Sequence, residues 1–356
     1  MKIAFFIEHI SGGGAERVLT TLANLFSDHG HNCIMITTIK RDDEYFLNDR
    51  IKRYVTEPKG YNGNRLIGPF RRLYRLRKIL KDESPDYLVS FLNRALYHGV
   101  LTTRGLRTKS VISVRNDPNF DYPNLWSRIL AKSLLPLSEG AVFQTPDAQK
   151  WFPKKLQRKS AIIYNPIGTT FYNVNYFPQE KSVVAVGRLN FQKNFKFLIN
   201  SFVKFQKTHK DWILHIYGEG EQMDTLQNLV NKLNAKDTIS LGGRISNVPE
   251  VISKSAIYAM TSDFEGAPNA LMEAMAVGMP CISSDCPCGG PRMLITNGEN
   301  GFLYNVGNQE EFITKLSILA ENESLRRDIG KEAKTKAQEF TAEKVYEAWY
   351  SFIKTL

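Results

Sequence analysis

Residues 258–292 constrain the fold of this chain more than any other stretch. They read YAMTSDFEGAPNALMEAMAVGMPCISSDCPCGGPR. An apolar run over residues 257–260 predicts a short strand, and a polar turn with Gly266 and Pro268 follows it. A short helix is expected from about Asn269 to Gly278, where the glycine ends it, and Pro280 leads into a second apolar strand. This order of strand, turn, helix and strand is typical of α/β proteins.

Two glutamates flank the start of the predicted helix. Glu265 falls in the turn, and Glu273 lies about one turn inside the helix. A turn at the carboxyl end of a strand, followed by an exposed helix N-terminus, is a natural anion site, because free N–H groups near Ala270 and Leu271 would face a phosphate. Taken alone, the two carboxylates also fit a loop charge and an ordinary helical glutamate.

The segment FEGAPNALMEAMAVGMPCISSD resembles the signature of the retaining glycosyltransferases of family 4, which have the GT-B fold and use nucleotide-sugar donors. The resemblance is specific because both the turn and the following Gly-x-Pro are present. It implies that Glu273 holds the ribose hydroxyls of the donor and that Glu265 lies beside the donor sugar. The donor-binding residues expected from this stretch are Glu265, Gly266, Asn269, Ala270, Leu271 and Glu273.

The resemblance implies an α/β fold of the GT-B type, with two doubly wound Rossmann-like domains facing a cleft that holds the donor. The rest of the chain agrees, because apolar runs alternate with helical segments, which predicts parallel strands joined by crossovers. In the first half these runs cover residues 2–8, 32–38, 86–91, 110–114, 140–144 and 161–164; in the second half they cover residues 182–186, 213–217 and 238–241.

Three segments follow from this pattern. Residues 1–167 are expected to form an acceptor-binding, membrane-facing domain, and residues 168–340 a domain that binds the nucleotide sugar. Residues 341–356 are expected to form a last helix that crosses back to the first domain, as in GT-B proteins.

The first predicted strand is followed by three glycines, Gly12, Gly13 and Gly14, and by a helix over residues 15–28. A glycine-rich turn lets the backbone approach a ligand closely. The spacing does not match the dinucleotide fingerprint well, and a plain tight turn fits equally. GGGAER resembles the start of many family 4 enzymes, where this loop borders the donor phosphates and the acceptor, so Gly13 and Gly14 are expected at the donor.

A second loop, GRLNFQKN, follows the strand over residues 182–186 and carries Arg188 and Lys193. A guanidinium can grip two phosphate oxygens and an ammonium adds a point charge. The loop resembles the pyrophosphate-binding segment of the family, although two loop cations are individually unremarkable. Arg244 begins a segment, residues 244–248, that is expected near the nucleobase.

Arg115 and Asn116 follow the strand over residues 110–114. The family often has a histidine near the reacting sugar at this position, so the polar contact from the first domain differs here. We expect both residues on the acceptor and sugar side, with Arg115 close to donor or acceptor phosphates. The alternative is that Arg115 pairs with Asp117 or Asp121.

Positive charge is confined to the first half of the chain. Residues 1–167 hold 27 Lys and Arg against 15 Asp and Glu, a net charge of +12, whereas residues 168–356 hold 20 against 21, a net charge of −1. Such asymmetry indicates a polyanion or an anionic membrane surface as the partner of the first half. Nucleic acid is not expected, because the aromatic-studded strand or recognition helix of a nucleic-acid module is missing.

The most basic segment is a predicted helix over residues 65–81. Its apolar stripe includes Leu66, Phe70, Leu76 and Leu80, and basic side chains occupy the remainder. The simplest interpretation is a surface helix that packs on the sheet, but anionic phospholipid headgroups would also attract this second face. Segments 126–137 and 151–155 could add aromatic and basic anchors. The residues predicted to contact a membrane are Arg71, Arg72, Arg75, Arg77 and Lys78.

The chain has no apolar run close to the roughly 20 residues of a membrane span. The opening KIAFFIEHI is too short, and too soon interrupted by Glu8, to be a secretory signal. We therefore expect a cytoplasmic protein, peripheral on the cytoplasmic face of the inner (plasma) membrane. Cys281, Cys286 and Cys288 crowd together but lack a metal-ligand spacing and a nearby histidine, so reduced thiols and no metal are expected.

The predicted function is transfer of a hexose or N-acetylhexosamine, such as GalNAc, GlcNAc or Gal, from a UDP-sugar. The acceptor is expected to be a polyprenyl-diphosphate-linked saccharide of bacterial O-antigen, lipopolysaccharide or capsule synthesis. Arg188, Lys193 and the helix at Ala270 would neutralise the leaving diphosphate without a metal or another cofactor, and Glu265 would support the anomeric carbon. The family implies retention of configuration, by attack on the face of the leaving group, whose phosphate takes the proton.

Two alternatives share part of this pattern. An enzyme like the GT-B UDP-sugar 2-epimerases would have the same nucleotide site, but it should carry acidic and histidine groups across the cleft, which the sequence does not provide. A non-catalytic membrane or nucleic-acid-binding protein would explain the charge of the first half but not the two glutamates and the two loop cations.

Overall fold

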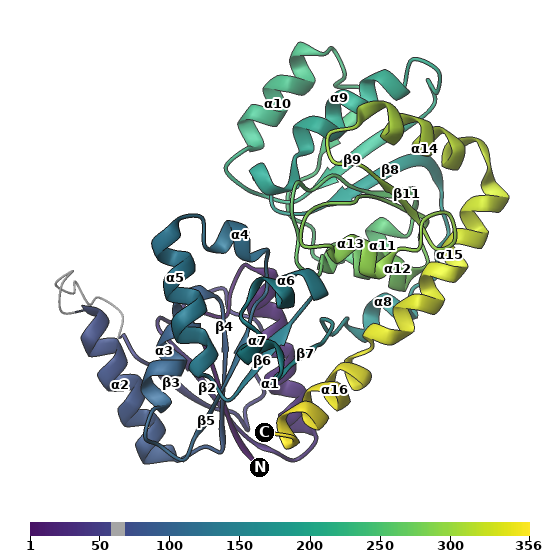
Figure 1. Ribbon diagram of the computed structural model, residues 1–356. Coiled ribbons are helices and arrows are strands. Elements are labelled where there is room, and N and C mark those ends of the chain that lie inside the picture. The colour runs from purple at the N-terminus through teal and green to yellow at the C-terminus, as the bar shows by residue number, and fades with distance from the viewer. Residues whose placement is uncertain (58–67) are drawn as a thin grey trace. The chain divides into compact units, whose positions relative to one another are not determined.

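The computed structural model of the chain describes residues 1–57 and 68–356. The described residues divide into two compact units (Figure 1). Unit 1 comprises Met1–Pro166 together with Ala342–Leu356, and unit 2 comprises Ile167–Thr341.

Over the described residues, unit 1 is built on a seven-stranded parallel sheet in the order β3-β2-β1-β4-β5-β6-β7. The register pairs Lys2 with Asn32 on one side of β1 and Ile3 with Tyr87 on the other. The strands are β1 (Lys2–Ile7), β2 (Asn32–Thr37), β3 (Lys52–Val55), β4 (Tyr87–Phe91), β5 (Lys109–Ser113), β6 (Gly140–Phe143) and β7 (Ser160–Ile162).

Helices cover both faces of this sheet, because its strands carry apolar side chains on both. Phe5 and Ile7 pack with α1 and α16, whereas Ala4 and Phe6 pack with α2 and α3, as the two-residue period of a strand requires. The helices of unit 1 are α1 (Gly14–Asp28), α2 (Gly68–Glu83), α3 (Asn93–Thr103), α4 (Pro118–Asp121), α5 (Leu125–Leu134), the short η1 (Leu135–Leu137), α6 (Pro146–Trp151), α7 (Lys154–Gln157) and α16 (Ala342–Lys354).

The last helix, α16, is part of unit 1 although most of unit 1 lies almost 200 residues earlier in the chain. Figure 1 shows α16, in yellow, beside the purple α1. Val345, Trp349 and Ile353 recur every four residues, so they share one helix face and are buried against the sheet. The Trp349 ring lies 6.0 Å from the ring of Phe91. Burial of this face is what attaches the C-terminus to unit 1.

Unit 2 has a six-stranded parallel sheet in the order β10-β9-β8-β11-β12-β13. The strands are β8 (Glu180–Val186), β9 (Ile213–Tyr217), β10 (Ile239–Leu241), β11 (Ser255–Met260), β12 (Cys281–Ser284) and β13 (Phe302–Tyr304). The helices are α8 (Thr169–Asn173), η2 (Phe191–Lys193), α9 (Phe195–Phe205), α10 (Met223–Lys232), α11 (Val248–Ile252), α12 (Asn269–Val277), α13 (Gly290–Leu294), α14 (Gln309–Glu321), α15 (Glu323–Ala337) and η3 (Gln338–Phe340).

Both sheets reverse their strand order once, between β1 and β4 in unit 1 and between β8 and β11 in unit 2. The connections after the two strands of such a switch point leave the sheet toward opposite faces, which opens a crevice at their carboxyl ends. In each unit this is where the polar turns of the sequence lie.

The structure differs from the sequence-based expectation in two places. Strand β3 was not predicted, because it is a short, half-exposed edge strand that begins with Lys52 and Arg53. The helix predicted over residues 65–81 is α2, which runs to Glu83, and residues 65–67 with Leu66 lie outside the described residues. In α2, Leu76 and Leu80 are buried as expected, whereas Phe70 is 74% exposed. Within the described residues no helix is long and apolar enough to cross a membrane.

Replacing Trp349 by Ala should destabilise unit 1, because the side chain is fully buried and the cavity left behind would not collapse. We expect a loss of about 3–5 kcal/mol in the free energy of unfolding, measured by chemical denaturation followed by circular dichroism. Trp126→Ala, at a 79% exposed position of the same unit, is the control and should change little. Equal effects of the two substitutions would contradict this account of α16.

Candidate functional site

The turn after β8 is held in shape by its own asparagines. Asn190 Oδ1 accepts a hydrogen bond from the Lys193 N–H (3.2 Å), and Asn194 Oδ1 accepts one from the Phe197 N–H (3.2 Å) at the start of α9. Asn194 takes a left-handed backbone conformation with φ of 47°, which asparagine tolerates better than most residues. The turn therefore presents Lys193 in a defined place.

The turn after β11 is fastened directly to the turn after β8. The Asp263 N–H donates to the Gln192 carbonyl (2.8 Å), and Gln192 Nε2 donates to the Phe264 carbonyl (2.9 Å). Thr261 Oγ1 donates to the carbonyl of Lys193 (3.0 Å). The two loops of the switch point thus form one hydrogen-bonded platform.

An ion pair completes this platform. Lys193 Nζ lies 2.5 Å from Glu265 Oε1, and Ser262 Oγ donates to the same oxygen at 2.8 Å. Glu265 is only 7% exposed, so its charge requires these partners. Among the described residues both of its hydrogen bonds go to Oε1, which leaves Oε2 for a ligand.

Helix α12 starts just beyond this ion pair and brings Glu273 to the same region. Residues 271–277 are all buried, and Glu273 is only 5% exposed in an otherwise apolar helix. Burial raises the pKa of Tyr258 on the neighbouring strand β11, and the negative charges of Glu273 and Glu265 add to this shift. The helix has no side-chain cap at its N-terminus, which begins at Asn269.

Two close backbone contacts explain the glycines of these loops. A Cβ on Gly290 would lie 1.6 Å from the carbonyl oxygen of Gly266, and a Cβ on Gly218 would lie 1.8 Å from that of Gly187. Gly218 also has a φ of 141°, a conformation that other residues avoid. The loop after β9 can approach the loop after β8, and the start of α13 can approach the loop after β11, only because glycine occupies positions 218 and 290.

The remaining predicted donor residues lie at the carboxyl edges of the sheets. Arg188 directly follows β8 and is exposed, and Arg244 follows β10 and is exposed. In unit 1, Gly13 and Gly14 form the turn after β1, where the Gly13 N–H donates to the Ser11 carbonyl (2.9 Å) and α1 begins at Gly14. The structure brings Lys193, Glu265, Glu273 and the start of α12 together within unit 2.

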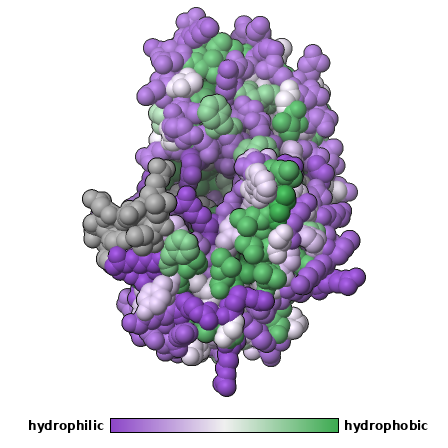
Figure 2. Space-filling model, turned by 60° about the vertical axis from the view of Figure 1, so that its left-hand side comes forward, coloured by the Kyte–Doolittle hydropathy of each residue, from purple (hydrophilic) through white to green (hydrophobic). Residues whose placement is uncertain are grey.

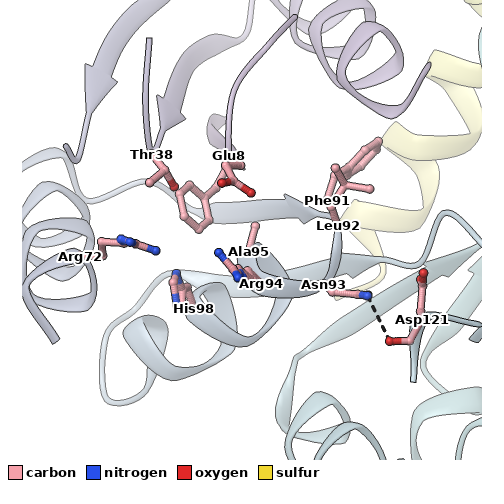
Figure 3. Close-up of a pocket in the computed structure, with 11 residues that line it drawn as sticks. Glu8, Thr38, Arg72, Phe91, Leu92, Asn93, Arg94, Ala95, His98 and Asp121 are labelled. Carbon is pink, nitrogen blue, oxygen red and sulfur yellow. Dashed lines mark hydrogen bonds between the residues drawn. The ribbon is translucent and has the colours of Figure 1, made fainter. Parts of the chain in front are cut away.

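Unit 1 contains a pocket of about 260 Å³ at the carboxyl ends of β1, β2 and β4 (Figure 3). It lies at the switch point of this sheet, and α3 begins at its edge. Figure 3 shows Glu8 and Thr38 on one side and Arg72, Arg94 and His98 on the other. The lining residues are Phe6, Glu8, Thr38, Arg72, Phe91, Leu92, Asn93, Arg94, Ala95, His98 and Asp121.

Two titratable groups of this pocket, His98 and Asp121, have shifted pKa values. Burial, followed by the charges of Arg72 and Arg94, lowers the pKa of His98, so the imidazole is neutral at pH 7. Burial raises the pKa of Asp121 to about 6, although hydrogen bonds from Asn116 and Asn93 oppose the shift. Perturbed groups in a cavity are typical of functional sites. Apart from Arg72, which was assigned to a membrane surface, sequence reasoning missed this pocket.

Arg115 and Asn116 both contact residues of the pocket. The Arg115 guanidinium lies 4.4 Å from the ring centroid of Phe91 and donates to Ser113 Oγ (3.2 Å) and to Asn165 Oδ1. Burial lowers its pKa, but a guanidinium stays protonated at neutral pH. Asn116 Nδ2 donates to Asp121 Oδ1 (3.4 Å). A partly buried cation that hydrogen-bonds to neutral groups is suited to an anionic ligand.

Three arginines of α2 form hydrogen bonds with other segments of unit 1. Arg72 pairs with Glu57 (2.5 Å), and Arg75 donates to the Thr56 carbonyl (2.6 Å). Arg77 donates to the carbonyls of Thr102 (2.7 Å) and Arg104 (2.8 Å). Arg71 and Lys78 are exposed. Membrane contact through α2 stays a prediction, and Arg72, Arg75 and Arg77 have hydrogen-bond partners within unit 1.

All four cysteines are buried as free thiols. Burial is the main cause that raises the pKa of Cys286 to about 12 and also raises that of Cys281. In the part of the chain that the structure describes, no three His, Cys, Asp or Glu side chains are placed to hold a metal ion.

Family models match both units. Residues 12–171 match the model described as Glycosyltransferase Family 4, and residues 171–336 match the model described as Glycosyl transferases group 1.

Individual relatives match over nearly the whole length. The chain is 25% identical to the GalNAc-alpha-(1->4)-GalNAc-alpha-(1->3)-diNAcBac-PP-undecaprenol alpha-1,4-N-acetyl-D-galactosaminyltransferase of Campylobacter jejuni, over 99% of this chain and 98% of that protein. It is 27% identical to the lipopolysaccharide 1,6-galactosyltransferase of Salmonella typhimurium, over 91% of this chain and 90% of that protein. The structure of Anabaena HepE in complex with UDP and glucose gives a TM-score of 0.86 at 18% identity, with 100% of both chains covered. This likeness shows that the fold is GT-B, as predicted.

The pocket of unit 1 should make stability depend on pH. Because the pKa of Asp121 is raised to about 6 from its ordinary 3.8, the folded state holds a proton that the unfolded state has already lost, and the free energy of unfolding falls as pH rises from about 4 to 6. Asp121→Asn should remove this fall and stabilise the protein above pH 6 by about 1–3 kcal/mol. Denaturant titrations from pH 4.5 to 8 measure it. The exposed Asp82→Asn on α2 is the control, and a wild-type pH profile in the Asp121 variant would refute the assignment.

Proposed function

Since the chain belongs to the glycosyltransferases of family 4 and group 1, we propose that it is a retaining, UDP-sugar-dependent enzyme. It would transfer GalNAc, GlcNAc or Gal to a polyprenyl-diphosphate-linked saccharide in bacterial surface polysaccharide synthesis. The observation that carries the proposal is the platform of unit 2, where the partly buried Lys193 pairs with the buried Glu265 across the switch point, next to the N-terminus of α12.

The donor diphosphate would bind at this platform. Lys193 and Arg188 supply cations from the turn after β8, and the N-terminus of α12 adds the positive end of the helix dipole. Glu273 lies one turn inside α12, and a buried carboxylate there suits the two ribose hydroxyls, which donate hydrogen bonds. Uridine is the first nucleobase to test, because the structural neighbour was solved with UDP.

Catalysis would rest on stabilising the leaving group. As the bond to the anomeric carbon breaks, negative charge grows on the diphosphate, and fixed cations beside it lower the barrier. Lys193 is held by Glu265 and by the rigid turn, so it needs little reorganisation when that charge appears. Glu265 would have the complementary role, because its carboxylate would stabilise the positive charge that develops on the sugar. The acceptor hydroxyl would attack on the same face and pass its proton to the leaving phosphate.

The pocket of unit 1 is the proposed acceptor site. It combines carboxylates and arginines, which hydrogen-bond sugar hydroxyls and phosphates, with the apolar surfaces of Phe6 and Phe91. Arg115 lies beside it as a partly buried cation that could bind a phosphate. The Campylobacter relative acts, by its name, on a saccharide linked to diphospho-undecaprenol, which supports a lipid-linked acceptor and a peripheral position on the cytoplasmic face of the inner membrane.

Glu273→Ala should abolish or weaken binding of UDP at least ten-fold, measured by calorimetric titration without added metal. The ribose hydroxyls would lose their acceptor, which is worth about 1.4 kcal/mol or more. Glu332→Ala, an exposed glutamate of α15, is the matched control, and Glu273→Gln separates a folding defect from the loss of charge. Unchanged UDP affinity in both Glu273 variants would contradict the donor site. If the wild type binds no uridine nucleotide, UDP as donor is wrong and GDP- or ADP-sugars come next.

Transfer should proceed at full rate in EDTA and give a product with the anomeric configuration of the donor, read by NMR.

Lys193→Ala should lower the rate of transfer about 10²–10³-fold, because one electrostatic contact to the leaving group is lost. Lys181→Ala is the control, since Lys181 is an exposed lysine paired with Asp211. A rate that collapses in EDTA, or an inverted product, would overturn the mechanism.

A further inference from the structure

Helix α5 exposes the side chains that an amphipathic helix normally buries. Leu125 is 68% exposed, Trp126 79%, and Ile129 and Leu130 are each 47% exposed. Their spacing of one and four residues places them on one side of the helix, which we call the α5 face, whereas Ala131 is buried beneath. Figure 2 shows apolar side chains gathered over α5, bordered by hydrophilic ones.

This exposure belongs to a firmly held helix. Asn124 and Ser127 form a capping box, with Asn124 Oδ1 accepting from the Ser127 N–H at 2.9 Å and Ser127 Oγ accepting from the Asn124 N–H at 3.2 Å. Arg128 Nε donates to the Tyr122 carbonyl (3.0 Å), which ties the helix to the preceding turn. The α5 face is thus presented in a fixed orientation.

The surroundings of the α5 face are cationic. Residues 123–159 contain seven Lys and Arg against two Asp and Glu, a net charge of +5, and α5 itself has two cations and no carboxylate. Lys132 Nζ lies 4.4 Å from the ring centroid of Trp151 on α6, so α6 adjoins α5. The exposed basic side chains beside the apolar ones are Arg128, Lys132, Lys150, Lys154 and Lys155.

We propose that the α5 face inserts into the headgroup region of an anionic phospholipid bilayer, with the lysines of α5 to α7 on the lipid phosphates. An apolar stripe with a tryptophan, flanked by more cations than carboxylates, matches the charge and polarity of that interface. The proposal rests on the proposed function only in that a lipid-linked acceptor would bring the enzyme to a membrane.

The α5 face is a better membrane contact than the arginines of α2. Moving Arg72, Arg75 or Arg77 to lipid phosphates would break their hydrogen bonds to Glu57, Thr56, Thr102 and Arg104. Insertion of the α5 face breaks no such hydrogen bond, and its four apolar side chains become buried in the bilayer.

The test is co-sedimentation of the full chain with vesicles of phosphatidylglycerol and phosphatidylethanolamine at low salt. The double variant Trp126→Ser, Ile129→Ser should lower the partition coefficient at least ten-fold, whereas Phe46→Ser should leave it unchanged. Phe46 is the matched control because it is 76% exposed in the same unit and its carbonyl accepts from Asn24 on α1, away from α5. Wild-type protein should bind less as salt rises.

Binding of UDP, measured in parallel, separates this inference from the proposed function. The double variant should bind UDP like the wild type, so loss of vesicle binding with intact UDP binding supports the α5 face. Vesicle binding that the double variant retains would overturn it. Equal wild-type binding to phosphatidylcholine alone would also overturn it, and so would a dimer that only the double variant dissociates, since the face would then belong to a second copy.

Discussion

The ion pair between Lys193 and Glu265 joins the two loops that meet at the switch point of the second sheet, and the proposed donor site depends on it. Each charge is nearly buried, so each needs the other. Because Lys193 is the last residue of η2 and Glu265 precedes α12, the pair sets the distance between a cationic turn and a helix N-terminus. A diphosphate site requires that combination, and neither loop provides it alone.

The same topological constraint organises unit 1, with a different chemical result. There the loops after β1 and β4 surround a pocket that is lined by both carboxylates and arginines. Asp121 is kept in that pocket against the cost of burial, which raises its pKa to about 6. Because the buried carboxylate of Asp121 destabilises the fold at neutral pH, its presence suggests a functional role. Binding of a polar acceptor, as we propose, would be such a role.

Sequence patterns predicted the parts of both units that local chemistry encodes. Gly266, Pro268 and Gly278 mark the turn and the helix end within 13 residues, so strand, turn and helix could be placed from the sequence. The edge strand β3 was missed because its stability comes from pairing with β2 and not from its own composition. The pocket was missed because Glu8, Asn93 and Asp121 are far apart in the chain and meet only once the sheet has formed.

The sequence by itself determined the α/β alternation, the family signature around Glu265 and Glu273, and the excess of positive charge in residues 1–167. These are properties of residue type and spacing, which folding does not alter. Only the tertiary structure decided which charges have partners and which apolar faces are covered. A helical pattern shows that a face exists but not what packs against it, so the arginines of α2 turned out to hold unit 1 together while the face of α5 remained open to solvent.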